Sequence, residues 1–161
     1  MAMPAAGVAA FVHAAAEERP DRQLLVVPQW QEADWATFLS HAQPLKVARG
    51  KVLIQEDASE RVIYFVSSGL LEVTSVMSSQ SMGTLAKVHP GSVVGELSFF
   101  DGRPRSAKVW SVADSELYRL QFDRFEAFAD AHPDKAWQLL LALGRVVSMR
   151  LRHTAPGSDR V

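Results

Sequence analysis

The sequence predicts a mainly β domain, a sandwich or barrel of short strands with helices at both ends. Between residues 45 and 121, short β-prone runs recur at close spacing with turn signals between them, which is typical of sandwiches and barrels. On both sides of that region apolar residues return at spacings of three and four, which indicates amphipathic helices. These two observations decide the fold class.

Length and composition agree with one globular domain. The chain has 161 residues, of which 48% are hydrophobic and 22% charged, and its formal net charge is -1. A chain of this length buries roughly 68–70% of its unfolded surface, enough to fold without covalent staples. It has no cysteine, which excludes disulfides, thiolate nucleophiles and cysteine-based metal centres. The net charge gives no global footprint for nucleic acid, and no run approaches the roughly 20 apolar residues that cross a bilayer.

Residues 1–23 are read as an Ala-rich leader. No Lys or Arg precedes the apolar stretch from Ala5 to Val12, whereas secretory signals carry such charges. A short helix or a frayed end is therefore predicted, and a cytoplasmic location is expected. The domain proper is expected over residues 24–153, and the polar tail 154–161 is expected to fray.

The elements follow in order. A first helix is predicted from about Pro28, which suits a first helical position, to Leu39, with Trp30, Trp35 and Phe38 on its apolar face. Seven strand-like runs come next, at residues 45–47, 51–54, 61–66, 70–76, 83–88, 107–112 and 116–121, with a polar hairpin loop at 78–81.

Two helices are predicted after the last strand. Phe122, Phe125 and Phe128 lie three residues apart, as on one face of a short helix. His132 and Pro133 interrupt this pattern, and a longer helix is then expected to begin at Pro133 or Asp134 and to reach about Arg152.

The longer helix carries two apolar faces. One is a narrow stripe resembling a coiled-coil seam, and the other is expected to face the strands. The stripe holds Trp137, Leu140, Leu141, Gly144, Val147, Ser148 and Leu151, and the second face holds Leu139, Leu143 and Val146. The stripe predicts a homodimer through this helix; the alternative is that both faces pack within one chain.

One segment between two strands has the residues of a phosphate site. Gly95 permits close backbone approach, and residues 96–100 can form one helical turn whose free amides point at an anion. Arg105 then enters the next strand, which would hold its guanidinium on a rigid element. With Glu96 as an acceptor for sugar hydroxyls, the segment predicts a ribose phosphate site; a surface ion pair across the loop is the alternative.

Other chemistries have less support. No two histidines stand at metal-ligand spacing, so no metal is expected. The acidic residues between 114 and 130 are interpreted as a solvated face. The basic end of the last helix, with Arg145, Arg150, Arg152 and His153, is interpreted as charge that favours a helix C-terminus rather than as a nucleic-acid contact.

The same segment resembles the phosphate-binding cassette of cyclic nucleotide-binding domains. The resemblance rests on Gly-Glu-Leu-Ser at 95–98 and Pro-Arg-Ser-Ala at 104–107, with eight residues between the glutamate and the arginine. Residues 50–57 and 64–73 resemble two strand motifs of that family. The resemblance extends from about residue 28 to 152.

The resemblance implies a fold, a ligand and a set of binding residues. The fold is an eight-stranded β-roll of the double-stranded β-helix or jelly-roll type, with an N-terminal helix, a short cassette helix and a C-terminal cap helix that moves on ligand binding. The ligand is cyclic AMP or cyclic GMP, without a metal; Glu96 accepts from the ribose 2′-hydroxyl and Arg105 pairs with the cyclic phosphate. The implied ligand-binding residues are Gly95, Glu96, Leu97, Ser98, Arg105, Ser106 and Ala107.

The resulting hypothesis is a cyclic nucleotide sensor that catalyses nothing and signals through its C-terminal helix to an unknown protein partner. The chain ends within about ten residues of that helix, so no helix-turn-helix and no DNA contact are expected from it, nor a membrane contact. A β-roll interaction module that no longer responds to nucleotide is the alternative. Loss of Glu96 or Arg105 would favour it, and both are present. An enzyme on the same scaffold lacks a catalytic constellation.

Overall fold

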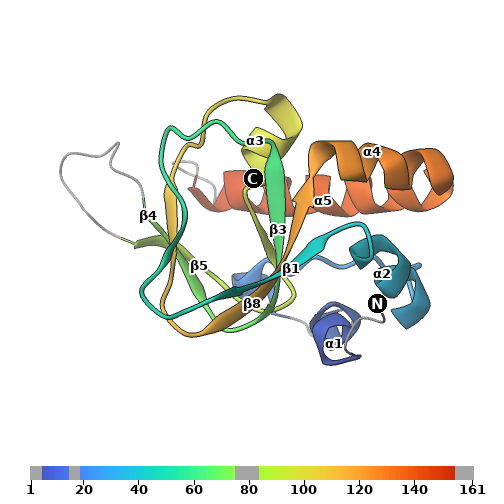
Figure 1. Cartoon of the computed structure of the whole chain (residues 1–161), viewed down its shortest axis with the longest axis horizontal. Coiled ribbons are helices and arrows are strands. Elements are labelled where there is room, and N and C mark those ends of the chain that lie inside the picture. The colour runs from blue at the N-terminus through green and yellow to red at the C-terminus, as the bar shows by residue number, and fades with distance from the viewer. Residues whose placement is uncertain (1–4, 15–18, 75–83, 155–161) are drawn as a thin grey trace.

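The computed structural model describes residues 5–14, 19–74 and 84–154, and two four-stranded antiparallel sheets form its centre (Figure 1). The strands are β1 (Gln43–Val47), β2 (Val52–Ile54), β3 (Val62–Ser68), β4 (Leu71–Thr74), β5 (Thr84–Val88), β6 (Val93–Val94), β7 (Lys108–Ser111) and β8 (Ser115–Gln121). One sheet has the order β1-β8-β3-β6 and the other β2-β7-β4-β5. Every strand contributes a buried side chain to one apolar cluster between the sheets, so the mainly β, eight-stranded β-roll is confirmed.

Strand β3 is buried on both faces, which explains its unbroken apolar sequence. Val62, Tyr64 and Val66 point into the cluster between the sheets. Ile63 and Phe65 belong to a second cluster that lies against the helices. Successive side chains of a strand point to opposite faces, so β3 carries apolar side chains for both cores.

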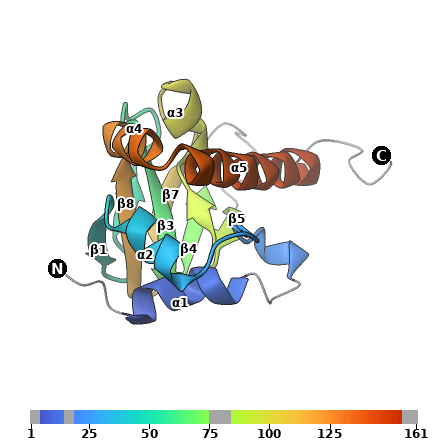
Figure 2. The same cartoon turned by 90° about the vertical axis from the view of Figure 1, so that its right-hand side faces the viewer.

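The helices cover the outer face of the sheet that contains β3. They are α1 (Ala5–Ala14), the 3-10 turn η1 (Pro20–Arg22), α2 (Glu32–Leu39), α3 (Glu96–Asp101), α4 (Phe122–Ala131) and α5 (Pro133–Thr154). Figure 2 shows α2 in front of the strands, with α5 above it and α1 below. Phe38 of α2 joins these layers, because its ring lies edge-on to Phe65 at 5.2 Å and to Phe128 at 5.0 Å between centroids.

The first predicted helix begins four residues later than the sequence pattern indicates. Residues around Pro28 form a turn closed by a hydrogen bond from the Trp30 amide to the Val27 carbonyl. The helix starts at Glu32 because Gln31 and Asp34 form a capping box, which satisfies free amides of the first turn.

All seven predicted strands are present, each with both ends within two residues of the expected bounds, and one further strand was not predicted from the residue pattern. Strand β6 has two residues, paired with Tyr64 and Phe65, and is too short to show a period. The predicted hairpin loop at 78–81 and the tail from 155 lie outside the described residues.

Helix α1 packs closely on the sheet. A Cβ atom on Gly7 would lie 1.8 Å from the hydroxyl of Tyr118, so this close approach requires a glycine. The Phe11 ring stacks on Trp35 with centroids 4.9 Å apart and meets Phe65 edge-on. The leader thus contributes an aromatic side chain to the same core as α2 and β3.

Helix α5 has the two faces that its sequence predicts. Leu139, Leu143 and Val146 are buried against the domain. Trp137 is 53% exposed and Leu141 66% exposed on the opposite stripe. Among the described helices, none is both long and apolar enough to span a bilayer.

The position of Phe11 predicts that α1 stabilises the whole domain. Phe11→Ala should lower the free energy of unfolding by about 3–5 kcal/mol, the usual cost of removing a buried phenyl ring. Urea unfolding measures this loss. The control is His13→Ala on the exposed side of the same helix, which should change stability by no more than about 0.5 kcal/mol. Equal effects of the two substitutions would contradict the role of α1 in the core.

Candidate functional site

A cavity of about 430 Å³ lies between the sheet β2-β7-β4-β5, strand β6 with helix α3, and the last turns of α5. Its wall is largely apolar. Ile54, Val73, Ala86, Val88, Val94 and Val109 line this part. All seven predicted binding residues reach the same cavity, namely Gly95, Glu96, Leu97, Ser98, Arg105, Ser106 and Ala107. The tertiary structure therefore brings together residues that the sequence places on both sides of a loop.

Gly95 forms the corner between β6 and α3. Its φ of +86° lies in the left-handed region, which glycine adopts without steric cost. A Cβ atom there would lie 2.7 Å from Nη1 of Arg105 and 3.1 Å from the carbonyl oxygen of Val62. Glycine thus permits both the turn into α3 and the close approach of the arginine.

Arg105 is buried, with only 3% of its surface exposed. Nη1 donates to the Gly95 carbonyl at 2.9 Å and Nη2 to the Val62 carbonyl at 2.7 Å. Its Nε finds no hydrogen-bond acceptor among the described residues. Burial lowers the pKa of the guanidinium, and the nearby Tyr64, Glu60 and Glu96 oppose this shift.

This arrangement favours an anion in the cavity. A buried charged donor without a partner is costly. Glu60 approaches Nη2 only at 3.9 Å and is itself half exposed, so it compensates little of that cost. Arg105 lines the cavity, so a phosphate oxygen bound there could accept a charge-assisted hydrogen bond from its guanidinium.

Helix α3 presents an acid and two early amides beside Arg105. Glu96, its first residue, is buried, and its Oε2 lies 2.9 Å from Nη1 of Arg150. Leu97 and Ser98 follow in the first turn, whose amides have no acceptor within an α-helix. The arrangement therefore combines a carboxylate acceptor with amide donors in one wall of the cavity.

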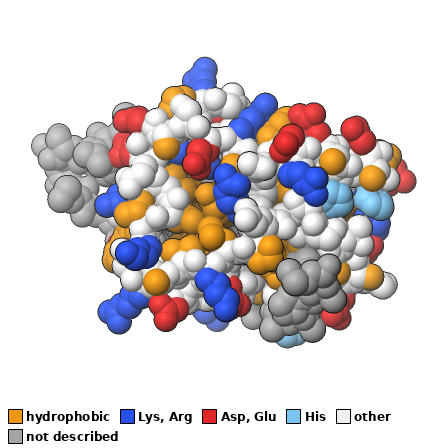
Figure 3. Space-filling view, in the orientation of Figure 1, with side chains coloured by type: hydrophobic (Ala, Val, Ile, Leu, Met, Phe, Trp, Pro, Cys, Tyr) orange, Lys and Arg blue, Asp and Glu red, His pale blue; other side chains and the backbone are white. Residues whose placement is uncertain are grey.

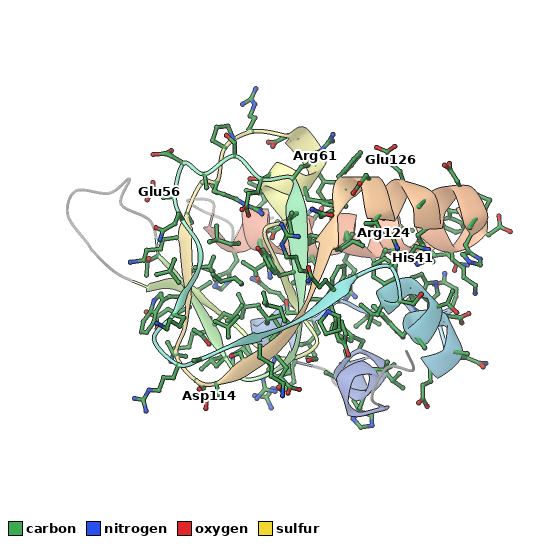
Figure 4. All side chains as sticks on the ribbon, in the orientation of Figure 1. His41, Glu56, Arg61, Asp114, Arg124 and Glu126 are labelled. Atoms are coloured by element: carbon green, nitrogen blue, oxygen red, sulfur yellow. The ribbon has the colours of Figure 1, made fainter. Side chains whose placement is uncertain are left out.

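Arg61 fixes the other end of α3 (Figure 4). Its Nε donates to the Phe99 carbonyl at 2.9 Å and its Nη2 to the Phe100 carbonyl at 3.0 Å. Its Cζ also lies 3.5 Å from the centre of the Phe122 ring. Arg61 thus ties α3 to α4 and makes this wall of the cavity a supported element.

Sequence reasoning missed four polar residues that line the cavity. They are Gln23, Lys87, Arg150 and His153. The interpretation of Arg150 as charge at a helix end was wrong, because its side chain turns back to Glu96. No spacing rule connects a helix end with a loop so distant in sequence, so only the packing of α5 reveals the contact.

On the face shown in Figure 3, Lys and Arg side chains are interspersed with Asp and Glu. Across the described residues there is no cluster of three or more His, Asp or Glu side chains placed to hold a metal ion.

Known proteins similar in sequence to this chain are associated with cyclic nucleotides. The profile of the family described as "Cyclic nucleotide-binding domain" matches residues 44–132. The chain is 25% identical over 119 residues to a "CRP-like cAMP-activated global transcriptional regulator" of Mycobacterium tuberculosis, covering 74% of this chain and 51% of the regulator. It is 23% identical over 122 residues to "Cyclic GMP-binding protein C" of Dictyostelium discoideum, covering 76% of this chain and 5% of that protein.

A solved structure agrees on the fold. A cyclic nucleotide-binding domain from Methylobacillus flagellatus superposes with a TM-score of 0.80 at 19% identity, covering 100% of this chain and 85% of the other. The chain spans about half the length of the Mycobacterium regulator.

The contact between Gly95 and Arg105 predicts a difference between the two glycines that flank α3. Gly95→Ala and Gly102→Ala both place alanine at a positive φ, which costs about 1–2 kcal/mol in each. Only Gly95→Ala also collides with Arg105, and it should lose about 1–3 kcal/mol more, as overpacked sites do. Urea unfolding measures the difference. Equal losses would show that Arg105 does not depend on the space beside Gly95.

Proposed function

The chain belongs to the cyclic nucleotide-binding domain family, and from this premise we propose that it senses cyclic AMP or cyclic GMP by binding it in the cavity, without catalysis. One observation carries the proposal: Arg105 is buried at the cavity wall with its Nε unpartnered among the described residues. A cyclic phosphate is an anion that suits this arginine. In the same ligand, the ribose could contact the adjacent Glu96 and the base could contact the apolar wall.

The proposed pose assigns each part of the ligand to a part of the cavity. The phosphate binds Arg105 and the amides of Leu97 and Ser98, with the Ser106 hydroxyl as a further donor. The ribose 2′-hydroxyl donates to Glu96. Ala107 packs under the ligand, and the base lies along the apolar wall.

The two cyclic nucleotides differ in the base that would lie along the apolar wall. Lys87 and His153 also line the cavity. Guanine offers acceptors at O6 and N7, whereas adenine pairs an acceptor with an amino donor. The relatives named above include both a cAMP-activated and a cyclic GMP-binding protein, so both nucleotides belong in the first titration.

The output is proposed to pass through α5 to a second copy of the chain and to a downstream protein. The end of this helix forms part of the cavity, and its outer stripe exposes Trp137, Leu141 and Leu151. Apolar side chains at coiled-coil spacing suit a matching helix. The same proposal places the protein in the cytoplasm, with a transcriptional regulator among its relatives as support.

Calorimetric titration with cyclic AMP and cyclic GMP tests the proposed function. Arg105→Ala should weaken binding by roughly 30- to 5,000-fold, because removal of one partner of a desolvated charge pair costs about 2–5 kcal/mol. The control is Arg103→Ala, an exposed arginine of the same loop, which should bind as the parent does. A parent protein that binds neither nucleotide would favour the alternative, an interaction module that does not respond to nucleotide.

The stripe on α5 predicts a dimer. Leu140→Glu combined with Val147→Glu should give a folded monomer, because charges would enter the helix seam. Arg145→Glu, at an exposed position of the same helix outside the stripe, should leave the dimer intact. Light scattering at about 100 µM detects even a micromolar dimer. A parent protein that is monomeric with and without nucleotide would contradict this assembly.

A further inference from the structure

The guanidinium of Arg150 contacts three other parts of the chain. Nη1 forms the 2.9 Å ion pair with Oε2 of Glu96. Nη2 donates to the Val93 carbonyl at 2.5 Å and to the Ser92 hydroxyl at 3.1 Å. Nε donates to Oε1 of Gln23 at 3.0 Å. One side chain from the last turns of α5 is thus fixed by the leader, the entry to β6 and the first residue of α3.

The partner in the leader is itself held in place. Gln23 adopts a left-handed conformation with a φ of 50°, which is uncommon for a residue with a side chain. Its carbonyl accepts a hydrogen bond from the Ser92 hydroxyl at 2.8 Å. The amide of Leu25 donates to the Gly91 carbonyl at 2.8 Å. These contacts keep the Gln23 amide group where Arg150 can use it.

The ion pair leaves Glu96 able to bind a ligand. A carboxylate has two oxygens and about four lone-pair sites, and Arg150 engages Oε2. The side chains of Glu96 and Arg150 are only 10% and 21% exposed, so solvent ions screen their attraction less than at an open surface. The pair therefore restrains the carboxylate while a second donor can still reach it.

We propose that Arg150 is a positioning residue for sugar recognition: it orients the Glu96 carboxylate towards a ligand hydroxyl, and Gln23 in turn orients Arg150. This inference rests on the proposed function and adds two residues that the cassette motif does not contain. Under this proposal, α5 and the leader both take part in recognising the ribose. A ligand hydroxyl bound to Glu96 is connected to α5 through Arg150, and to the leader through the contact between Arg150 and Gln23.

A thermodynamic cycle that combines a change in the protein with a change in the ligand tests the inference. The parent protein and Arg150→Met are titrated with the cyclic nucleotide that binds and with its 2′-deoxy analogue. Methionine keeps an apolar stem but makes no ion pair. Arg150→Met should bind the ribonucleotide about 10-fold more weakly, a change equivalent to about 1.4 kcal/mol, and should bind the deoxy analogue within about 2-fold of the parent. A purely structural role would weaken both ligands by the same factor.

Three further variants separate the parts of the proposal. Arg150→Lys keeps a charge for Glu96 without the planar fork and should recover part of the lost affinity for the ribonucleotide. Gln23→Ala should show a smaller loss of the same kind, restricted to the ligand with the 2′-hydroxyl. Arg152→Met, an exposed arginine of the same helix turn, is the control and should bind both ligands as the parent does. Thermal unfolding of each variant verifies that it is folded.

The outcomes distinguish this inference from the proposed function. Equal losses for both ligands in Arg150→Met overturn the positioning role and leave nucleotide binding intact. Tighter binding of the ribonucleotide also overturns it, because Arg150 would then compete with the ribose for Glu96. A Gln23→Ala variant with unchanged binding overturns the part assigned to the leader. A parent protein that binds neither nucleotide overturns the proposed function and, with it, this inference.

Discussion

The double burial of β3 is the constraint on which the rest of the structure depends. One face of this strand closes the cluster between the two sheets, and the other carries the helical layer. Side chains alternate along a strand, so a shift in register by one residue would exchange the two sets. The pairing of β3 with β8 and with β6 therefore places both cores and, through β6, the start of the cassette.

The cassette depends on β3 through polar contacts as well. The Val62 carbonyl, at the first residue of β3, accepts from the buried Arg105, and Arg61 immediately before it holds the carbonyls at the end of α3. Two consecutive residues thus anchor both sides of the loop. Loops that carry function are commonly positioned by a rigid scaffold in this way. Here the scaffold also leaves one donor of Arg105 without a partner among the described residues.

Three sets of residues on different parts of helix α5 face different surroundings. Leu139, Leu143 and Val146 bind it to its own domain, the outer stripe exposes apolar side chains, and Arg150 and His153 reach the cavity near its end. The residues that reach the cavity and the residues of the exposed stripe therefore belong to one continuous helix. The proposed coupling of ribose recognition to this helix and to the leader requires no long chain of contacts, since Arg150 touches both Glu96 and Gln23.

The sequence by itself determined the fold class, the order of most elements and the segment around Gly95 and Arg105, which lines the cavity. These are local properties, because strand alternation, helical period and a compact motif each involve residues that are close together in the sequence. The start of α2 was predicted too early, because Pro28 was taken as its first residue and the capping box at Gln31 was not recognised. Strand β6 was not predicted, because two residues are too few to show an alternating pattern. Only the tertiary structure decided that the leader enters the aromatic core, that Arg105 is buried with one open donor, and that Arg150 pairs with Glu96. Each of these depends on side chains brought together from segments far apart in the chain, by packing around β3 that no local pattern encodes.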